Sequence, residues 1–270
     1  MSAATSLRQG DQGPGVQALQ QALAAQGFAL VASGTFDATT LAAVQAFQSR
    51  AGLPADGLAG PRTLAALGGA ADPRQLAPAD LQSAAATLAV PLAAVQAVTE
   101  VESRGSGFLE DGRPVILFER HVFYARLVER RGRATAELLA RDYPNLVNPQ
   151  PGGYGNGASE WQRITLARQL DENLALESAS WGLFQIMGYH WQTLGYAGIQ
   201  DFAERLSSGA AAQLEAFVRF LRTQPGLLQA LRTGKWADFA RGYNGPGYAR
   251  NLYDIKLARA FARYKAESAR

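Results

Sequence analysis

Glu102 is the residue whose position in this sequence best suits acid catalysis. Leu92, Val95 and Val98 recur at the spacing of one helix face, and Glu102, four residues further on, extends that apolar stripe. Burial disfavours the charged form of a carboxyl group, so we expect Glu102 to keep its proton near neutral pH. A protonated carboxyl group is what general acid cleavage of a glycosidic bond requires. Taken alone, the pattern fits a buried structural glutamate equally well.

Three short motifs follow one another along the chain and favour the catalytic interpretation. They are Glu-Ser-x-Gly-x-Gly over 102–107, Ala-Ser-Trp-Gly-Leu-Phe-Gln-Ile-Met over 179–187 and Ala-Arg-Gly-Tyr-Asn-Gly over 240–245. The first resembles the catalytic corner of goose-type lysozymes and lytic transglycosylases, in which serine follows the glutamate. The second resembles their Gly-Leu-x-Gln segment, which lines the sugar cleft, and the third resembles their Ala-x-Tyr-Asn-x-Gly motif.

The resemblance is closer still to one branch, the phage-type N-acetylmuramidase domain, and spans almost all of 90–265. The matching segments are 98–103, 107–109, 111–114, 117–121 with Phe123, 143–145, 152–155, 160–161, 180–188 and 243–248. This resemblance implies that Glu102 is the catalytic acid and that Glu119 is a second carboxyl group, which positions or activates water. Glu119 could instead pair with a neighbouring cation such as Arg120. Glu102 could then act alone as acid and base.

We expect the substrate to be bound by residues that lie inside the matched motifs. These are Ser180, Trp181, Gln185, Tyr243 and Asn244. Aromatic rings offer flat apolar faces to sugar rings, and side-chain amides can donate to and accept from N-acetyl and hydroxyl groups. Packing in the core is an equal alternative for each aromatic ring, including those of Tyr189 and Tyr248.

Residues 1–70 carry a separate set of motifs. Apolar spacing over 16–23, a capping residue (Asp37 or Thr39) and a proline at Pro61 predict three short helices. The motifs are Leu-Arg-Gln-Gly-Asp over 7–11, Val16 with Leu19-Gln20, Gly-x-Phe-Asp-x-x-Thr over 34–40, Ala-Val-x-x-Phe-Gln over 43–48, Gly-Leu-x-x-Asp-Gly over 52–57 and Gly-Pro-x-Thr over 60–63. Together they resemble the small three-helix peptidoglycan-binding domain, which implies binding to bacterial cell walls. A generic helical hairpin is the alternative.

The elements around these motifs predict an all-α fold. We expect a peptidoglycan-binding domain over 1–70, a linker over 71–87 that could contain a short connecting helix, and a lysozyme-like catalytic domain over 88–270. In the larger domain, periodicity predicts helices over 91–103, 159–177, 210–222 and 252–263. The apolar run Val115–Phe118 is the exception, so at most a minor β-hairpin accompanies the helices.

Composition excludes several other kinds of site. Of 270 residues, 47% are hydrophobic and 18% charged, which is typical of a soluble protein with a sizeable core. Cysteine is absent, and His121 and His190 have no metal-binding motif beside them, so we expect no metal and no cofactor. The net charge is only +3, and the middle of the chain has no basic stripe, which argues against nucleic-acid binding. Residues 241–270 hold seven basic residues against Asp254 and Glu267, or +5, which favours contact with anionic envelope lipids or simply a solvated face.

The sequence therefore predicts a peptidoglycan hydrolase that cleaves the β-1,4 bond between N-acetylmuramic acid and N-acetylglucosamine and lyses bacteria. A lytic transglycosylase acting on the same bond and a non-catalytic wall-binding virion protein are the alternatives. Residues 1–10 lack a cationic segment followed by an apolar run, as expected of a chain without a signal peptide. With the binding module first, this resembles phage endolysins of Gram-negative hosts. We expect a monomer that accumulates in the host cytoplasm before its release to the cell wall.

Overall fold

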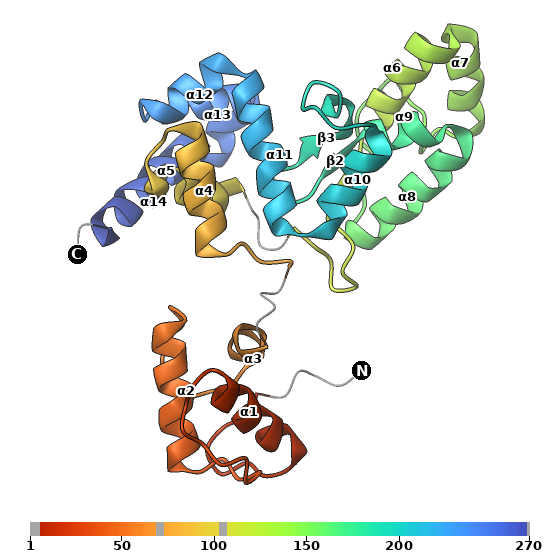
Figure 1. Ribbon diagram of the computed structural model, residues 1–270. Helices are drawn as coiled ribbons and strands as arrows, with labels where there is room; N and C mark the ends of the chain where they lie inside the picture. Colours follow the sequence, from red (N-terminus) through yellow and green to blue (C-terminus); the bar gives the residue numbers. More distant parts are fainter. Residues whose placement is uncertain (1–5, 69–72, 103–106, 269–270) are drawn as a thin grey trace. The chain divides into compact units, whose positions relative to one another are not determined.

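The computed structural model describes residues 6–68, 73–102 and 107–268 (Figure 1). The chain divides into two compact units, Met1–Pro73 and Arg74–Arg270, and each unit has a hydrophobic core of its own. Helices dominate both units, as the all-α expectation requires. Ser103 of the Glu-Ser motif lies outside the described residues.

The first unit contains the three predicted helices, α1 (Pro14–Ala25), α2 (Ala38–Arg50) and α3 (Pro61–Leu67). Asp37 caps α2, because its Oδ1 accepts a hydrogen bond of 2.8 Å from the backbone N–H of Thr40. Proline opens α1 and α3, where its missing N–H costs no helical hydrogen bond. The core gathers the apolar faces of these helices, and it consists mainly of Val16, Leu19, Leu23, Phe36, Val44, Phe47 and Leu67.

Two buried glutamines join the helices of this unit to its loops. Gln20 on α1 and Gln48 on α2 are each 1% exposed. Gln48 Oε1 accepts from Gly57 N at 2.9 Å, and its Nε2 donates to Leu58 O at 3.0 Å. Gln20 makes equivalent bonds to the 33–40 segment. Loops without regular structure are therefore held by side-chain amides that satisfy their backbone groups.

The second unit is a helical bundle around a small sheet. Its helices are α4 (Pro78–Leu88), α5 (Leu92–Glu102), α6 (Arg120–Arg131), α7 (Arg133–Asp142), α8 (Gly157–Leu170), α9 (Glu172–Glu177), α10 (Ile199–Ser208), α11 (Ala210–Thr223), α12 (Pro225–Arg232), α13 (Trp236–Asn244) and α14 (Tyr253–Glu267), with 3-10 turns η1 (Gly188–His190) and η2 (Pro246–Asn251). Strands β1 (Ile116–Phe118), β2 (Ala179–Trp181) and β3 (Ile186–Met187) pair antiparallel in the order β1-β2-β3. In the view of Figure 1, strands β2 and β3 lie between α11 and the group of helices from α6 to α9.

Two predicted boundaries are wrong. The expected single helix over 159–177 is interrupted at Asp171, whose extended backbone (φ −159°) ends α8 and whose Oδ1 caps α9 by accepting from Leu174 N at 3.1 Å. The expected linker over 71–87 contains most of α4, whose buried Ala84, Ala85 and Leu88 belong to the core of the second unit. Among the described residues no single helix is long and apolar enough to cross a bilayer, although the bent pair α4–α5 passes by length and composition together.

Candidate active site

The second unit contains a cleft of about 710 Å³ whose walls come from segments far apart in the sequence. It is lined by the end of α5, by β1, by the 155–160 segment, by the β2–β3 turn, by η1 and by α11 and α13. Five of the seven predicted site residues line it, namely Glu102, Ser180, Gln185, Tyr243 and Asn244. Trp181 and Glu119 are not among its lining residues.

Glu102 is the last residue of α5 and is half-buried at the cleft wall. Val98 and Val95, one and two turns before it, are 0% and 1% exposed, so the predicted apolar stripe is the buried face of the helix. Asn244 ends α13 and donates from Nδ2 to Glu102 Oε1 at 3.0 Å. Glu100 lies on the exposed face instead and pairs with Arg263 and Tyr264 of α14.

Tyr243 connects α13 to the β2–β3 turn. Its hydroxyl donates to the carbonyl oxygen of Phe184 at 2.6 Å, and its ring stacks on Phe239 at 5.7 Å between centroids. Burial raises the pKa of Tyr243 well above its ordinary value, and the nearby charge of Glu102 raises it further. The phenol therefore stays protonated and keeps the turn against α13.

The β2–β3 turn presents an amide to the cleft. Ser180 Oγ donates to Gln185 Oε1 at 2.7 Å, and Gln185 Nε2 donates to Gly182 O at 2.8 Å. Gln185 has φ +47°, in the left-handed region that non-glycine residues seldom occupy. The turn is held from behind by the buried Gln213, whose Oε1 accepts from Leu183 N at 2.8 Å. A strained backbone supported in this way is common at binding sites.

Trp181 corrects one expectation. It is 2% exposed, and its Nε1 donates to Leu176 O at 3.2 Å. Its ring packs edge-to-face against Trp161 and Phe202. Trp181 is therefore a core residue, because its faces and its polar atom are all engaged inside the protein.

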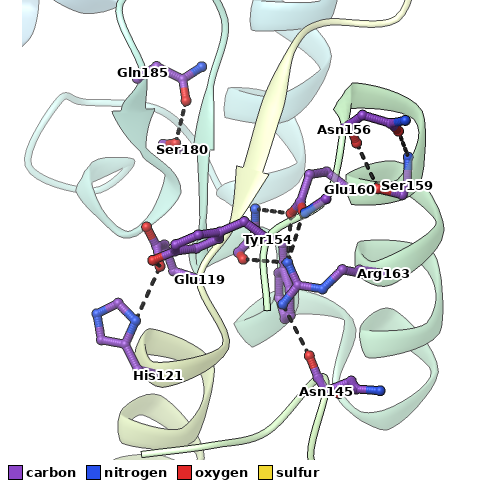
Figure 2. Close-up of polar contacts among 12 residues, drawn as sticks. Glu119, His121, Asn145, Tyr154, Asn156, Ser159, Glu160, Arg163, Ser180 and Gln185 are labelled. Carbon is purple, nitrogen blue, oxygen red and sulfur yellow. Dashed lines mark hydrogen bonds and ion pairs between the residues drawn. The ribbon is translucent and has the colours of Figure 1, made fainter. Parts of the chain in front are cut away.

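Glu119 follows β1 directly and precedes α6. Side chains alternate along a strand, so Glu119 shares the less buried face of β1 with Leu117, which lines the cleft. Glu119 Oε2 accepts from the Tyr154 hydroxyl at 2.8 Å and lies 3.2 Å from His121 Nδ1 (Figure 2). The alternative pairing with Arg120 is not seen, since Arg120 donates to the carbonyl oxygens of Pro144, Gln150 and Pro151.

Tyr154 is a partner of Glu119 that sequence reasoning did not identify. Burial, followed by the hydrogen bond to Glu119, raises the pKa of Tyr154 above its ordinary value of 10.0. The Tyr154 hydroxyl therefore remains a donor to Glu119 throughout the neutral range. Its place within the matched segment 152–155 was the only signal in the sequence.

Glu160 is a second carboxyl group in the cleft wall whose role the sequence did not reveal. It is 1% exposed and forms an ion pair with Arg163, with 2.8 Å between Oε2 and Nη1. Oε1 accepts from the backbone N–H of Gly155 at 2.7 Å, and Oε2 accepts from that of Phe118 at 2.9 Å. Both oxygens also accept from Arg163 Nη1. Four hydrogen bonds occupy the acceptor capacity of a carboxylate, so Glu160 is unsuited to exchange protons with a substrate.

The remaining wall of the cleft is aromatic. Tyr189 is 36% exposed. The guanidinium carbon of Arg126 lies over its ring, 5.1 Å from the centroid of the Tyr189 ring. His190 beside it packs edge-to-face on Phe220. Burial, and secondly the charge of Arg126, lower the pKa of His190, so this imidazole is neutral at pH 7. His190 therefore adds a neutral polar group to the wall. Phe220 and Tyr253 complete the lining, and no sequence motif marked them.

Comparisons with known proteins identify the family of each unit. Residues 91–265 match the family model described as N-acetylmuramidase, and residues 12–67 match the one described as putative peptidoglycan binding domain. The crystal structure of a Burkholderia AP3 phage endolysin is similar, with a TM-score of 0.72, 50% sequence identity, and coverage of 98% of this chain and 99% of that chain.

A curated relative, the N-acetylmuramoyl-L-alanine amidase CwlL of Bacillus licheniformis, is 44% identical over 73 residues. That match covers 25% of this chain and 20% of the amidase, so it indicates that the two proteins share one module. The N-acetylmuramidase match, in contrast, spans more than half of the present chain and includes every residue of the cleft described above. The chain belongs to the N-acetylmuramidase family and carries a peptidoglycan-binding domain on its N-terminal side.

Proposed function

We propose that this protein is an endolysin-type N-acetylmuramidase that hydrolyses the β-1,4 bond between N-acetylmuramic acid and N-acetylglucosamine and so lyses bacteria. The observation that carries the proposal is the placement of Glu102, half-buried in the cleft wall and held by Asn244. The similarity to a phage endolysin along nearly the whole chain supports the biological role.

Glu102 is the proton donor in the proposed reaction. The hydrogen bond from Asn244 to Oε1 leaves the acid proton on Oε2, from which it passes to the glycosidic oxygen as the bond to the anomeric carbon breaks. The Glu119 carboxylate orients the water that then attacks the sugar cation and accepts the proton that this water loses, and exchange with solvent afterwards returns both carboxyl groups to their starting states. Ser180, Gln185, Tyr243 and Asn244 line the cleft where the sugar rings would lie, and their polar groups suit N-acetyl and hydroxyl groups.

Replacing Glu102 by Gln tests the acid, because the amide keeps the shape and cannot transfer the proton. We expect turnover of purified peptidoglycan to fall by about 10²–10⁴-fold while wall binding persists. Glu102→Gln lysing walls at a rate near that of the wild type would refute the assignment. Glu119→Gln tests the second carboxyl group in the same assay.

A lytic transglycosylase is the second candidate, and one observation favours it. Glu119 is absent from the residues that line the cleft, which suits a reaction in which Glu102 acts alone as acid and then as base. Mass spectrometry of the released muropeptides separates the two reactions. Reducing ends indicate hydrolysis, and products lighter by one water indicate transglycosylation.

The peptidoglycan-binding domain and the basic end of the chain would serve delivery to the wall. We propose that the exposed Lys256, Arg259 and Lys265 of α14, next to the exposed Ile255, contact anionic envelope lipids. Reversing the charges of Lys256 and Arg259 should weaken binding to phosphatidylglycerol vesicles and leave hydrolysis of purified walls unchanged. Unchanged vesicle binding would exclude the lipid contact. We further propose that the protein accumulates in the host cytoplasm before its release, which the similarity to a phage endolysin supports. We propose that it acts as a monomer.

A further inference from the structure

The buried ion pair of Glu160 and Arg163 on α8 makes hydrogen bonds to backbone groups of three residues, Phe118, Asn145 and Gly155 (Figure 2). Glu160 accepts from the N–H groups of Phe118 and Gly155. Arg163 donates from Nη1 to Phe118 O at 3.1 Å and from Nη2 to Asn145 O at 3.1 Å. The pair therefore ties the end of β1 and the 145–155 segment to one helix.

Two of these contacts fall on peptide groups that belong to Glu119 and Tyr154. The carbonyl of Phe118 is part of the peptide that joins it to Glu119, and Arg163 holds it. The N–H of Gly155 is part of the peptide that joins it to Tyr154, and Glu160 holds it. A Cβ on Gly155 would collide with Ser159 Oγ, so a larger residue there would displace the Ser159 side chain next to Glu160.

The side chains of Glu119 and Tyr154 meet through a hydrogen bond of 2.8 Å, although 34 residues separate them in the sequence. Tyr154 is 49% exposed, so packing alone does not determine its position. A hydrogen bond between two partly exposed side chains requires that both backbones be placed independently. The ion pair supplies that placement from a site where burial strengthens each of its polar contacts.

We propose that the Glu160–Arg163 ion pair is a positioning device for the reaction, which sets the carboxyl group of Glu119 by holding its peptide and that of its partner Tyr154. This inference rests on the proposed role of Glu119. The polar groups of Glu160 and Arg163 are bonded to each other and to the backbone, so neither side chain needs to touch the reacting atoms for this role. Their contribution is made through the backbone.

The test combines turnover with a titration of Tyr154 that does not depend on activity. In the full chain, Glu160→Gln replaces one acceptor oxygen by an NH₂ group facing a backbone N–H. We expect kcat on purified peptidoglycan to fall on the order of 10–100-fold with KM within about twofold, the pattern of a displaced catalytic group. Carbon-13 NMR of labelled tyrosine should show the pKa of Tyr154 moving down towards 10.0, as in Glu119→Gln. Tyr154→Phe assigns the resonance.

Ile164→Ala is the matched control, since Ile164 is fully buried on the same helix and makes none of these polar bonds. It should lose stability while kcat and the Tyr154 titration stay as in the wild type. Should Glu160→Gln fail to fold, Arg163→Lys serves instead, because one ammonium group cannot reach Glu160, Phe118 O and Asn145 O together.

The outcomes separate the two levels of the argument. An unchanged Tyr154 titration and kcat in folded Glu160→Gln, or equal losses in Ile164→Ala, would overturn the positioning role. Full activity in Glu119→Gln would instead remove the proposed role of Glu119, and with it the link to catalysis, whatever the titration shows.

Discussion

Replacing Gln213 by leucine should destabilise the second unit and disturb the cleft from behind. Gln213 is 1% exposed. Its Oε1 accepts from Leu183 N at 2.8 Å, and its Nε2 donates to Leu206 O at 2.9 Å near the end of α10. Leucine has a similar volume but leaves both backbone groups buried without these partners.

The expected cost follows from these two bonds. A buried donor or acceptor left unsatisfied costs about 1–3 kcal/mol. Two such groups cost about 2–6 kcal/mol, and the added apolar burial of leucine places the net loss near the lower end, about 3 kcal/mol. For a unit of this size, each 1 kcal/mol lowers the melting temperature by roughly 2–4 °C, so we expect a fall of about 6–12 °C.

Tryptophan fluorescence is a selective assay for this loss, because Trp161, Trp181, Trp191 and Trp236 all belong to the second unit. Gln229→Leu is the matched control, since Gln229 is exposed on α12 and its substitution should change stability by less than about 0.5 kcal/mol. Without the hydrogen bond to Gln213, the turn that carries Gln185 should hold its position less well. We therefore expect weaker substrate binding and a higher KM. A melting temperature of Gln213→Leu equal to that of Gln229→Leu would refute the reasoning.

Three further predictions concern other parts of the chain. Asn244→Asp replaces the hydrogen-bond donor to Glu102 with a second carboxyl group. Turnover of purified peptidoglycan should fall about 100-fold or more, with little change in melting temperature. Turnover at the wild-type rate would mean that the hydrogen bond is dispensable. Because the pKa of His190 is lowered in the folded protein, the unfolded chain binds more protons than the folded protein below the ordinary His pKa of 6.5. The free energy of unfolding should therefore fall as the pH drops below 6.5. His190→Gln should lessen this fall in denaturant titrations from pH 7 to 4, and equal pH dependence of the wild type and the variant would contradict the prediction. Gln48→Leu leaves the backbone N–H of Gly57 without its acceptor and removes one of the donors to Leu58 O, so it should cost the first unit about 1–3 kcal/mol, a large share of the stability of so small a domain. Wall binding should be lost before hydrolysis of soluble glycan fragments, and retained binding would argue against this reasoning.

Local signals in the sequence were sufficient where one segment determines its own structure. The stripe that ends at Glu102, the cap at Asp37 and the prolines that open α1 and α3 each act within a few residues. Helix α4 lies in a segment that the sequence predicts to be a linker or a short connecting helix, because its alanines give little contrast between faces. The same small side chains allow Ala84 and Ala85 to pack closely in the core.

Signals that depend on distant partners were less informative. The pattern over 159–177 is continuously helical, and only the side chain of Asp171 reveals the break between α8 and α9. A tryptophan inside a sugar-cleft motif was equally suited to the core or the cleft. Trp161 and Phe202, 20 and 21 residues away in the sequence, decide for the core.

Two carboxyl groups of the second unit show why function is harder to predict than fold. Glu119 and Glu160 both lie in segments that match the family, and nothing in their neighbouring residues distinguishes a reactive carboxylate from a structural one. Hydrogen bonding distinguishes them. Four bonds occupy Glu160, whereas among the residues that the structure describes Glu119 accepts one hydrogen bond, of 2.8 Å from the Tyr154 hydroxyl, and lies beside His121. Those partners come from β1, α6, α8 and the 145–155 segment. The more polar partners a carboxylate has in the fold, the less it can do for a substrate, and only the folded chain shows how many it has.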